Sequence, residues 1–119
     1  MLKGSCHCGA ITFTCSAEPE WLTQCNCSIC RRYGALWAHS DTDQITVSGV
    51  PDASLKYVWG DEKLAFHVCK KCGCLTHWES LSSEKPKRLA INCRMSEPQQ
   101  VDQFRVRHFD GADTWRYLD

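Results

Sequence analysis

Hydrophobic and polar residues alternate along much of this chain. The alternation is clearest in six runs: Ile11–Cys15, Ile45–Val47, Leu55–Trp59, Leu64–Val68, Leu89–Cys93 and Phe104–His108. Because successive side chains of a strand point to opposite faces of a sheet, this period of two predicts half-buried β-strands. Turn-forming Gly, Pro, Asp and Ser residues separate the runs. The pattern predicts an all-β fold of short antiparallel strands, as in a sandwich or barrel.

Only two stretches favour a helix, and both are very short. Ser28–Tyr33 is predicted to form one or two turns with Ser28 as the N-cap, and Pro98–Gln103 is the second candidate. In the last strand run, Arg105 and Arg107 alternate with apolar residues. We therefore expect one buried and one solvated face there, with both arginines as surface charges.

Composition limits the class of protein. A chain of 119 residues with 43% hydrophobic residues and five Trp is expected to form a single globular domain over residues 1–119. Fourteen Lys and Arg balance fourteen Asp and Glu, so no basic excess attracts nucleic acid or an anionic membrane. No apolar stretch approaches transmembrane length.

The chain has ten cysteines, which suits either a secreted disulfide scaffold or a set of metal ligands. Its first residues, MLKGSCHCGA, lack the apolar segment of a signal peptide, so we expect a cytoplasmic protein in a reducing environment. Clustered cysteines in that environment are more often metal ligands or catalytic thiols than disulfides. We therefore favour metal binding.

Two pairs of cysteines lie in turns that end in glycine. Cys6 and Cys8 precede Gly9, while Cys69 and Cys72 precede Gly73, about sixty residues later. Together they supply the four thiolates of a structural tetrahedral zinc site. Such a site closes a long loop, with a binding free energy of about 10–16 kcal/mol. The alternative for Cys69 and Cys72 is a thioredoxin-type redox pair, but the flanking strand patterns lack the βαβ setting it requires.

The motif Cys25-Asn-Cys27-Ser-Ile-Cys30 supplies three thiolates from one turn. Three ligands leave a fourth position of a zinc ion for substrate, as in catalytic sites, where the metal is a Lewis acid. A fourth protein ligand is the alternative, and six residues qualify: Cys15, Cys74, Cys93, His39, His67 and His77. Arg31 and Arg32 follow the motif and either add positive potential or form surface ion pairs.

Five segments, in this order, carry a resemblance to a known family: GSCHCGAITF, CNCSICRRYGAL, FHVCKKCG, INCRM and DGADTW. From about Gly4 to Trp115 the chain resembles the glutathione-dependent formaldehyde-activating enzyme and centromere protein V family. The resemblance implies an all-β, zinc-stabilised β-tent-like fold with two zinc ions. Cys6, Cys8, Cys69 and Cys72 would hold the structural ion, and Cys25, Cys27 and Cys30 the catalytic one.

The resemblance also implies an activity, the joining of glutathione to formaldehyde as S-(hydroxymethyl)glutathione, which is classed as carbon-sulfur lyase chemistry. The partner would be a small thiol such as glutathione, and Arg31, Arg32 or Arg94 would bind its carboxylates. The rival hypothesis is a non-catalytic, zinc-stabilised β-tent module that docks a partner through an aromatic side chain such as Trp37 or Trp115.

Overall fold

The computed structural model describes residues 1–119 as a β-protein with two short α-helices. The strands are β1 (Leu2–Ser5), β2 (Thr12–Cys15), β3 (Trp21–Cys25), β4 (Trp37–Asp41), β5 (Ile45–Ser48), β6 (Ser54–Tyr57), β7 (Leu64–Cys69), β8 (Leu75–Ser80), β9 (Arg88–Asn92) and β10 (Arg105–Phe109). The helices are α1 (Ser28–Tyr33) and α2 (Pro98–Val101), and a 3₁₀ turn, η1, spans Cys93–Met95. The predicted all-β fold class is confirmed. Neither helix has the length and hydrophobicity that a membrane-spanning segment needs.

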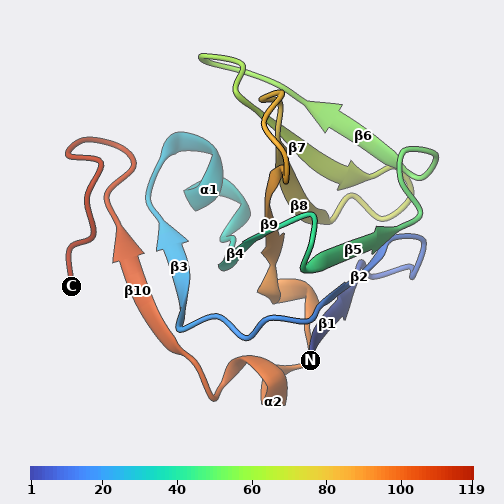
Figure 1. Ribbon diagram of the computed structural model, residues 1–119, viewed down its shortest axis with the longest axis horizontal. Helices are drawn as coiled ribbons and strands as arrows, with labels where there is room; N and C mark the ends of the chain where they lie inside the picture. The colour runs from blue at the N-terminus through green and yellow to red at the C-terminus, as the bar shows by residue number, and fades with distance from the viewer.

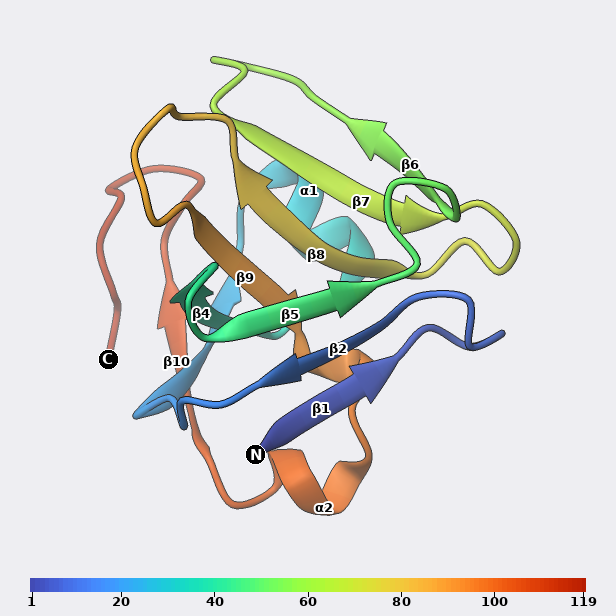
Figure 2. The same ribbon diagram turned by 45° about the vertical axis from the view of Figure 1, so that its right-hand side comes forward.

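The strands form two sheets. The small sheet has the order β1-β2-β5, and the large one has the order β10-β3-β4-β9-β8-β7-β6 (Figure 1). All pairings are antiparallel except that of β10 with β3, which is parallel. Figure 2 shows the small sheet lying across the front of the large one, with β5 nearest to β9. Two inclined sheets of this kind form the tent-like arrangement.

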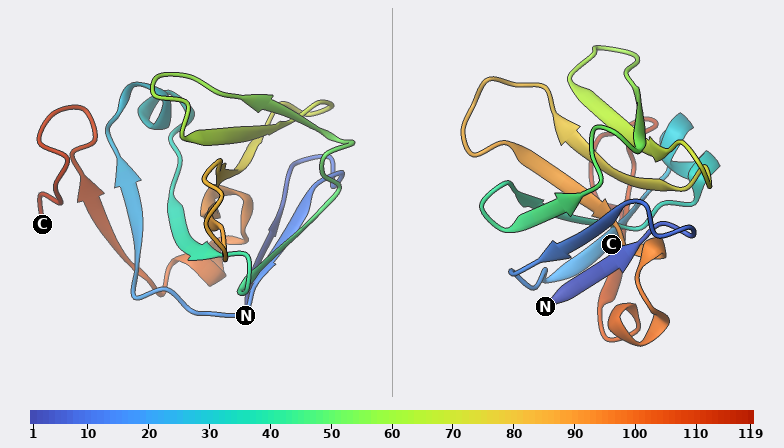
Figure 3. Two further views of the ribbon diagram at one scale, coloured as in Figure 1. Left: turned by 45° about the horizontal axis from the view of Figure 1, so that its top comes forward. Right: turned by 90° about the vertical axis from the view of Figure 1, so that its right-hand side faces the viewer.

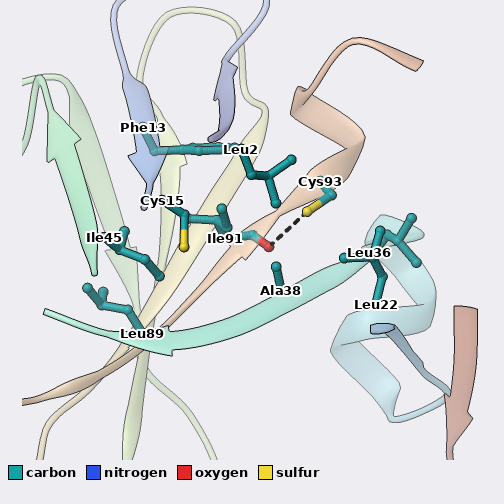
Figure 4. Packing of buried hydrophobic residues seen from close by; sticks show 10 residues of the cluster. All are labelled: Leu2, Phe13, Cys15, Leu22, Leu36, Ala38, Ile45, Leu89, Ile91 and Cys93. Carbon is teal, nitrogen blue, oxygen red and sulfur yellow. Dashed lines mark hydrogen bonds between the residues drawn. The ribbon is translucent and has the colours of Figure 1, made fainter. Parts of the chain in front are cut away.

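The main core lies between these sheets. Leu2, Phe13 and Ile45 come from the small sheet and face Leu89 and Ile91 of β9 (Figure 4). Each of these five side chains is at least 93% buried. Full burial of such a side chain stabilises the fold by about 1.5–3 kcal/mol, so the contact between the sheets is a major source of stability.

Five of the predicted strand runs lie on strands of the structure, namely those of β5, β6, β7, β9 and β10, and the run Ile11–Cys15 contains β2. The sequence pattern missed β1, β3, β4 and β8. In β8, Leu75, Thr76, His77 and Trp78 are all buried, so both faces of the strand are covered and no alternation appears in the sequence.

The helix predictions are right in position and wrong in detail. Helix α1 spans Ser28–Tyr33 as expected, but its N-cap is Cys27, and Ser28 is already the first helical residue. Gly34 ends the helix at φ 62°, where its N–H donates to the carbonyl oxygens of Cys30 and Arg31. Helix α2 ends at Val101, two residues earlier than predicted.

The prediction that Arg107 is a simple surface charge is wrong. Its guanidinium lies 4.5 Å from the ring centroid of Trp21 and 4.1 Å from that of Tyr117. His108, predicted to lie on the buried face of β10, instead has a side chain that is 53% exposed. The edge strand β10 thus directs an arginine, rather than the histidine, toward its aromatic neighbours.

Candidate functional site

Four cysteines from two distant turns meet at one point. The β1–β2 turn brings Cys6 and Cys8, and the β7–β8 turn brings Cys69 and Cys72, with all four sulfur atoms within 4.8 Å of one another. Figure 2 shows both turns at the same edge of the molecule. We call these residues the four-Cys cluster. The four thiols grouped by sequence spacing are therefore together in space.

The spacing of these sulfur atoms fits a tetrahedral ion. Sulfur atoms at about 2.3 Å from a zinc ion at the centre of a tetrahedron lie about 3.8 Å apart. The Sγ atoms of Cys6 and Cys8 are 3.8 Å apart, and those of Cys8 and Cys69 are 3.6 Å apart. Backbone N–H groups of Cys74 and Cys8 lower the pKa of Cys72 to about 5, which favours the thiolate that a metal needs. This cluster can hold a metal ion with protein ligands alone.

The second cluster comes from a single local segment. Cys25 ends β3, Cys27 is the N-cap of α1, and Cys30 lies in the first turn of that helix, and their sulfur atoms also lie within 4.8 Å of one another. We call these residues the three-Cys cluster. Figure 1 shows α1 directly after β3, so a tight strand-to-helix turn suffices to gather three ligands.

Neighbouring donors orient two of the three sulfur atoms. The indole N–H of Trp37 donates to Cys30 Sγ at 3.3 Å, and the backbone N–H of Cys27 donates to Cys25 Sγ at 3.4 Å. The thiol of Cys30 donates to Cys25 and, with the N–H groups of Cys27 and Gly111, lowers the pKa of Cys25 to about 6. The same pairing and burial raise the pKa of Cys30. One thiolate is thus favoured at neutral pH, as binding a cation requires.

None of the six residues considered as a fourth ligand joins the three-Cys cluster. Cys15 and Cys93 pack in the main core (Figure 4), and Cys74 packs beside the four-Cys cluster. His67 and His77 stack on each other with ring centroids 4.2 Å apart. Of the six, only His39 lines the same cleft as the cluster. Its ring is tilted against that of Trp78, with the ring centroids 5.7 Å apart. Burial and the charge of Arg88 lower the pKa of His39 to about 4.

The three-Cys cluster opens onto a cleft of about 920 Å³. All five tryptophans of the chain line this cleft: Trp21, Trp37, Trp59, Trp78 and Trp115. The sequence analysis singled out only Trp37 and Trp115, and neither as part of a substrate pocket. The available signal was the high tryptophan count, but residues so far apart in sequence give no sign that they share one surface.

The three arginines considered as carboxylate ligands lie outside this cleft. Arg31 lines a smaller hollow of about 270 Å³ that shares Cys25 and Cys30 with the cleft. Arg32 Nη1 donates to the Ser28 carbonyl at 2.7 Å, and Arg94 Nε donates to the Gly34 carbonyl at 3.0 Å. The basic side chains of the cleft other than His39 are Lys63 and Arg88. A role for the three arginines in binding glutathione stays a prediction.

The segment after β10 covers one side of the three-Cys cluster. A Cβ atom on Gly111 would lie 2.6 Å from Cys25 Sγ and 3.2 Å from Cys27 Cβ, so the chain passes too close for any side chain. The Asn26 amide donates to Asp110 Oδ1 at 2.9 Å, and this hydrogen bond holds the pKa of Asp110 below its usual value. The DGADTW segment is therefore tied to the CNC motif that it covers.

The match to a protein family decides the identity of the chain. Residues 1–107 match the model of the family described as glutathione-dependent formaldehyde-activating enzyme. The chain belongs to this family. The matched range contains both cysteine clusters of this family member, whereas Gly111, Trp115 and Tyr117 of the cleft lie beyond it.

The proteins similar to this family member include a curated relative and a solved structure. A Halomonas elongata protein named "Putative glutathione-dependent formaldehyde-activating enzyme" is 33% identical over 81 residues, which are 60% of this chain and 52% of that protein. The chain thus spans about half the length of the curated relative it matches. A crystal structure of a Rhodobacter sphaeroides protein superposes with a TM-score of 0.69 at 25% identity, covering 88% of this chain and 99% of the other.

Proposed function

We propose that this protein is a zinc-dependent enzyme of carbon–sulfur bond chemistry that acts on a small thiol adduct. The observation that carries the proposal is the three-Cys cluster at the floor of a cleft of about 920 Å³, with no fourth protein ligand beside it. Structural zinc sites have four protein ligands, and catalytic sites have three. In this proposal the four-Cys cluster holds a structural zinc ion and the three-Cys cluster a catalytic one.

The reaction we propose is the one that the family name describes. The sulfur of glutathione adds to the carbon of formaldehyde, so a C–S bond forms, the C=O π bond breaks, and the thiol proton moves to the carbonyl oxygen. The product is S-(hydroxymethyl)glutathione. A zinc ion held by these three thiolates would supply a Lewis acid, which lowers the pKa of an exogenous ligand.

The protein's own groups have three tasks in this mechanism. Cys25, Cys27 and Cys30 would hold the metal, and the indole N–H of Trp37 donates to the Cys30 sulfur and fixes its direction. The segment at Gly111 covers Cys25 on one side, so a substrate approaches from the cleft. Positioning two reactants side by side reduces the entropic cost of their encounter, which accelerates a reaction that also proceeds without a catalyst.

A second candidate is a zinc-stabilised binding module, and one observation favours it. Trp115 is 71% exposed at the mouth of the cleft and is available to a partner. Trp37, the other aromatic considered for docking, is only 2% exposed and cannot serve. A surface that only docks a partner does not need a three-Cys cluster that lacks a fourth ligand, so the enzyme is the stronger proposal.

Replacement of one ligand of the three-Cys cluster tests the proposal. We expect the wild-type chain to bind two zinc ions and the Cys27→Ser variant one, with an unchanged circular-dichroism spectrum. Exchange NMR of glutathione with ¹³C-formaldehyde should show turnover above the uncatalysed rate in the wild type. In the variant, the catalysed rate should fall about hundredfold, because one ligand of the catalytic metal is lost.

Cys74→Ser is the matched control, because Cys74 is also half-buried but belongs to neither cluster. It should retain both ions and full activity. Two zinc ions and full exchange activity in Cys27→Ser would contradict the catalytic role of the three-Cys cluster.

A further inference from the structure

The cleft above the three-Cys cluster has two aromatic walls. One wall comes from β4, β7 and β8 and contains Trp37, Phe66 and Trp78. The other comes from β3, β10 and the C-terminal segment. It contains Trp21, Phe109, Trp115 and Tyr117. Figure 3 shows in its left panel that β3, β10 and the C-terminal segment lie on one side of the molecule, away from β7.

The rings of each wall pack against one another and not across the cleft. On the first wall, the ring centroid of Trp37 is 6.3 Å from that of Phe66 and 6.4 Å from that of Trp78. These contacts, edge-on or tilted, fix the rings in place. The walls are therefore rigid surfaces before any ligand arrives.

The second wall is built in the same way. Trp21 meets Tyr117 edge-on at 5.8 Å, and Phe109 meets Trp115 at 5.1 Å and Tyr117 at 5.0 Å. The indole N–H of Trp21 donates to the Tyr117 hydroxyl at 3.2 Å. No aromatic contact joins the two walls, so the space between them is free for a ligand.

Two tryptophans at this cleft remain exposed to water. Trp59 is 39% exposed and Trp115 is 71% exposed. Trp115 also has φ 60°, a backbone conformation that bulky side chains rarely adopt. Exposed apolar surface and backbone strain in one residue both carry a free-energy cost, and such features gather at ligand-binding sites.

The size of the cleft also exceeds what formaldehyde needs. At about 920 Å³ it lies at the upper end of the range for sites that take drug-sized molecules. Glutathione would fill part of it, but glutathione has two carboxylates and one ammonium group. Of the cleft's basic side chains, Lys63 lies 3.9 Å from Asp61, and burial lowers the pKa of His39 to about 4. Arg88 is left to bind one carboxylate. Glutathione has three charged groups and no aromatic ring, so it leaves the aromatic walls without a matching planar group.

We propose that the cleft binds a planar aromatic group carried by one of the two reacting partners, between the wall of Trp37 and the wall of Trp21, where it also meets the exposed Trp59 and Trp115. This inference rests on the carbon–sulfur bond chemistry of the proposed function and adds aromatic partners to the substrates of the site, beyond glutathione and formaldehyde. The source of the group is either an aromatic aldehyde in place of formaldehyde or a thiol with an aromatic substituent. In both cases the C–S bond forms as the C=O π bond breaks, and the thiol proton moves to the carbonyl oxygen.

Direct binding tests this inference apart from catalysis. We would titrate benzaldehyde and phenylmethanethiol into the Cys27→Ser protein by calorimetry and by quenching of tryptophan fluorescence. Cyclohexanecarbaldehyde is the matched ligand of similar size that is not planar. At least one aromatic probe should bind about tenfold more tightly than the cyclohexane compound, since a stacked ring contributes about tenfold in affinity.

The variants Trp59→Ala and Trp115→Ala should each weaken aromatic binding by about tenfold, because each removes one ring from the cleft. Tyr57→Ala is the control, since Tyr57 is 52% exposed and lies outside the cleft. The control should leave affinity unchanged. The probe that binds identifies which partner carries the ring.

Two results would overturn the inference: neither aromatic probe binds better than cyclohexanecarbaldehyde, or binding is the same in the two tryptophan variants and in Tyr57→Ala. These failures are distinct from failure of the proposed function, which depends on zinc content and on exchange activity in the wild type. Suppose that the wild-type protein binds two zinc ions and an aromatic probe but shows no exchange activity. This result would contradict the proposed enzymatic function and still support an aromatic ligand for the cleft.

Discussion

Both cysteine clusters consist of sulfur ligands, but they differ in the length of chain that they join. The four-Cys cluster joins turns that are 61 residues apart, measured from Cys8 to Cys69, while the three-Cys cluster is contained in the six residues from Cys25 to Cys30. An ion in the first closes a long loop of chain, which stabilises the fold by constraining it. An ion in the second constrains almost no additional chain. The distance between the ligands along the sequence thus distinguishes a cluster suited to stabilising the fold from one suited to binding a substrate.

The two clusters also differ in the number of sulfur ligands and in their access to a cleft. Around the four-Cys cluster, backbone N–H groups supply hydrogen bonds, such as that from Ile11 to Cys6 Sγ at 3.3 Å, and four sulfur atoms lie within 4.8 Å of one another. The three-Cys cluster receives a hydrogen bond from the backbone N–H of Cys27 as well as from the indole N–H of Trp37, and it opens onto a large cleft. A full coordination shell on rigid turns suits a structural ion, and an incomplete one in a cleft suits an exchangeable ligand.

The largest expected effect comes from breaking the four-Cys cluster. Cys69 is 1% exposed and its sulfur lies 3.6 Å from that of Cys8. Structural zinc contributes about 10–16 kcal/mol, as much as the whole stability of a typical domain. We expect Cys69→Ser to abolish cooperative thermal unfolding, measured by calorimetry, while Cys27→Ser retains it. Cooperative unfolding of Cys69→Ser at the wild-type temperature would remove the distinction between the clusters.

A smaller effect, confined to the three-Cys cluster, is expected from Gly111→Ala. The added Cβ would lie 2.6 Å from Cys25 Sγ, and such overpacking costs about 1–3 kcal/mol. We expect one of two zinc ions to be lost at a chelator concentration about tenfold lower than in the wild type, with the other ion unaffected. Asp113→Ala, an exposed position in the same segment, is the control. Equal weakening of both ions would show that the clusters are not independent.

The cysteine clusters could be predicted from sequence because their information is local. Two C-x-C or C-x-x-C turns each supply half of a tetrahedral shell, and the motif at Cys25 supplies three ligands within one turn. Because a tetrahedral ion needs four ligands, each two-ligand turn is completed by the other. The sequence favoured an open fourth position at Cys25, but it left six other Cys and His residues as alternatives, and only the tertiary structure places these elsewhere.

The cleft could not be predicted because its walls depend on non-local strand pairing. The parallel pairing of β10 with β3 brings Phe109 beside Cys25, and no pattern in either segment specifies that partner. Strand β4 begins with Trp37 and Ala38, both buried, so it lacks the alternation that would mark it as a strand. Strands β4 and β8 were therefore missed, because their consecutive buried residues give no alternation in the sequence.

The smallest expected effect concerns the wall rather than the metal. Arg107 is 21% exposed and packs over the rings of Trp21 and Tyr117, whereas Arg105, on the same strand, is exposed and contacts no ring. A half-buried cation–π contact contributes about 1 kcal/mol, so Arg107→Ala should lower the melting temperature by about 4 °C and Arg105→Ala should leave it unchanged. Zinc content should stay at two ions in both variants, because neither residue touches a cluster. An equal effect of the two substitutions would mean that charge, not stacking, stabilises this wall of the cleft.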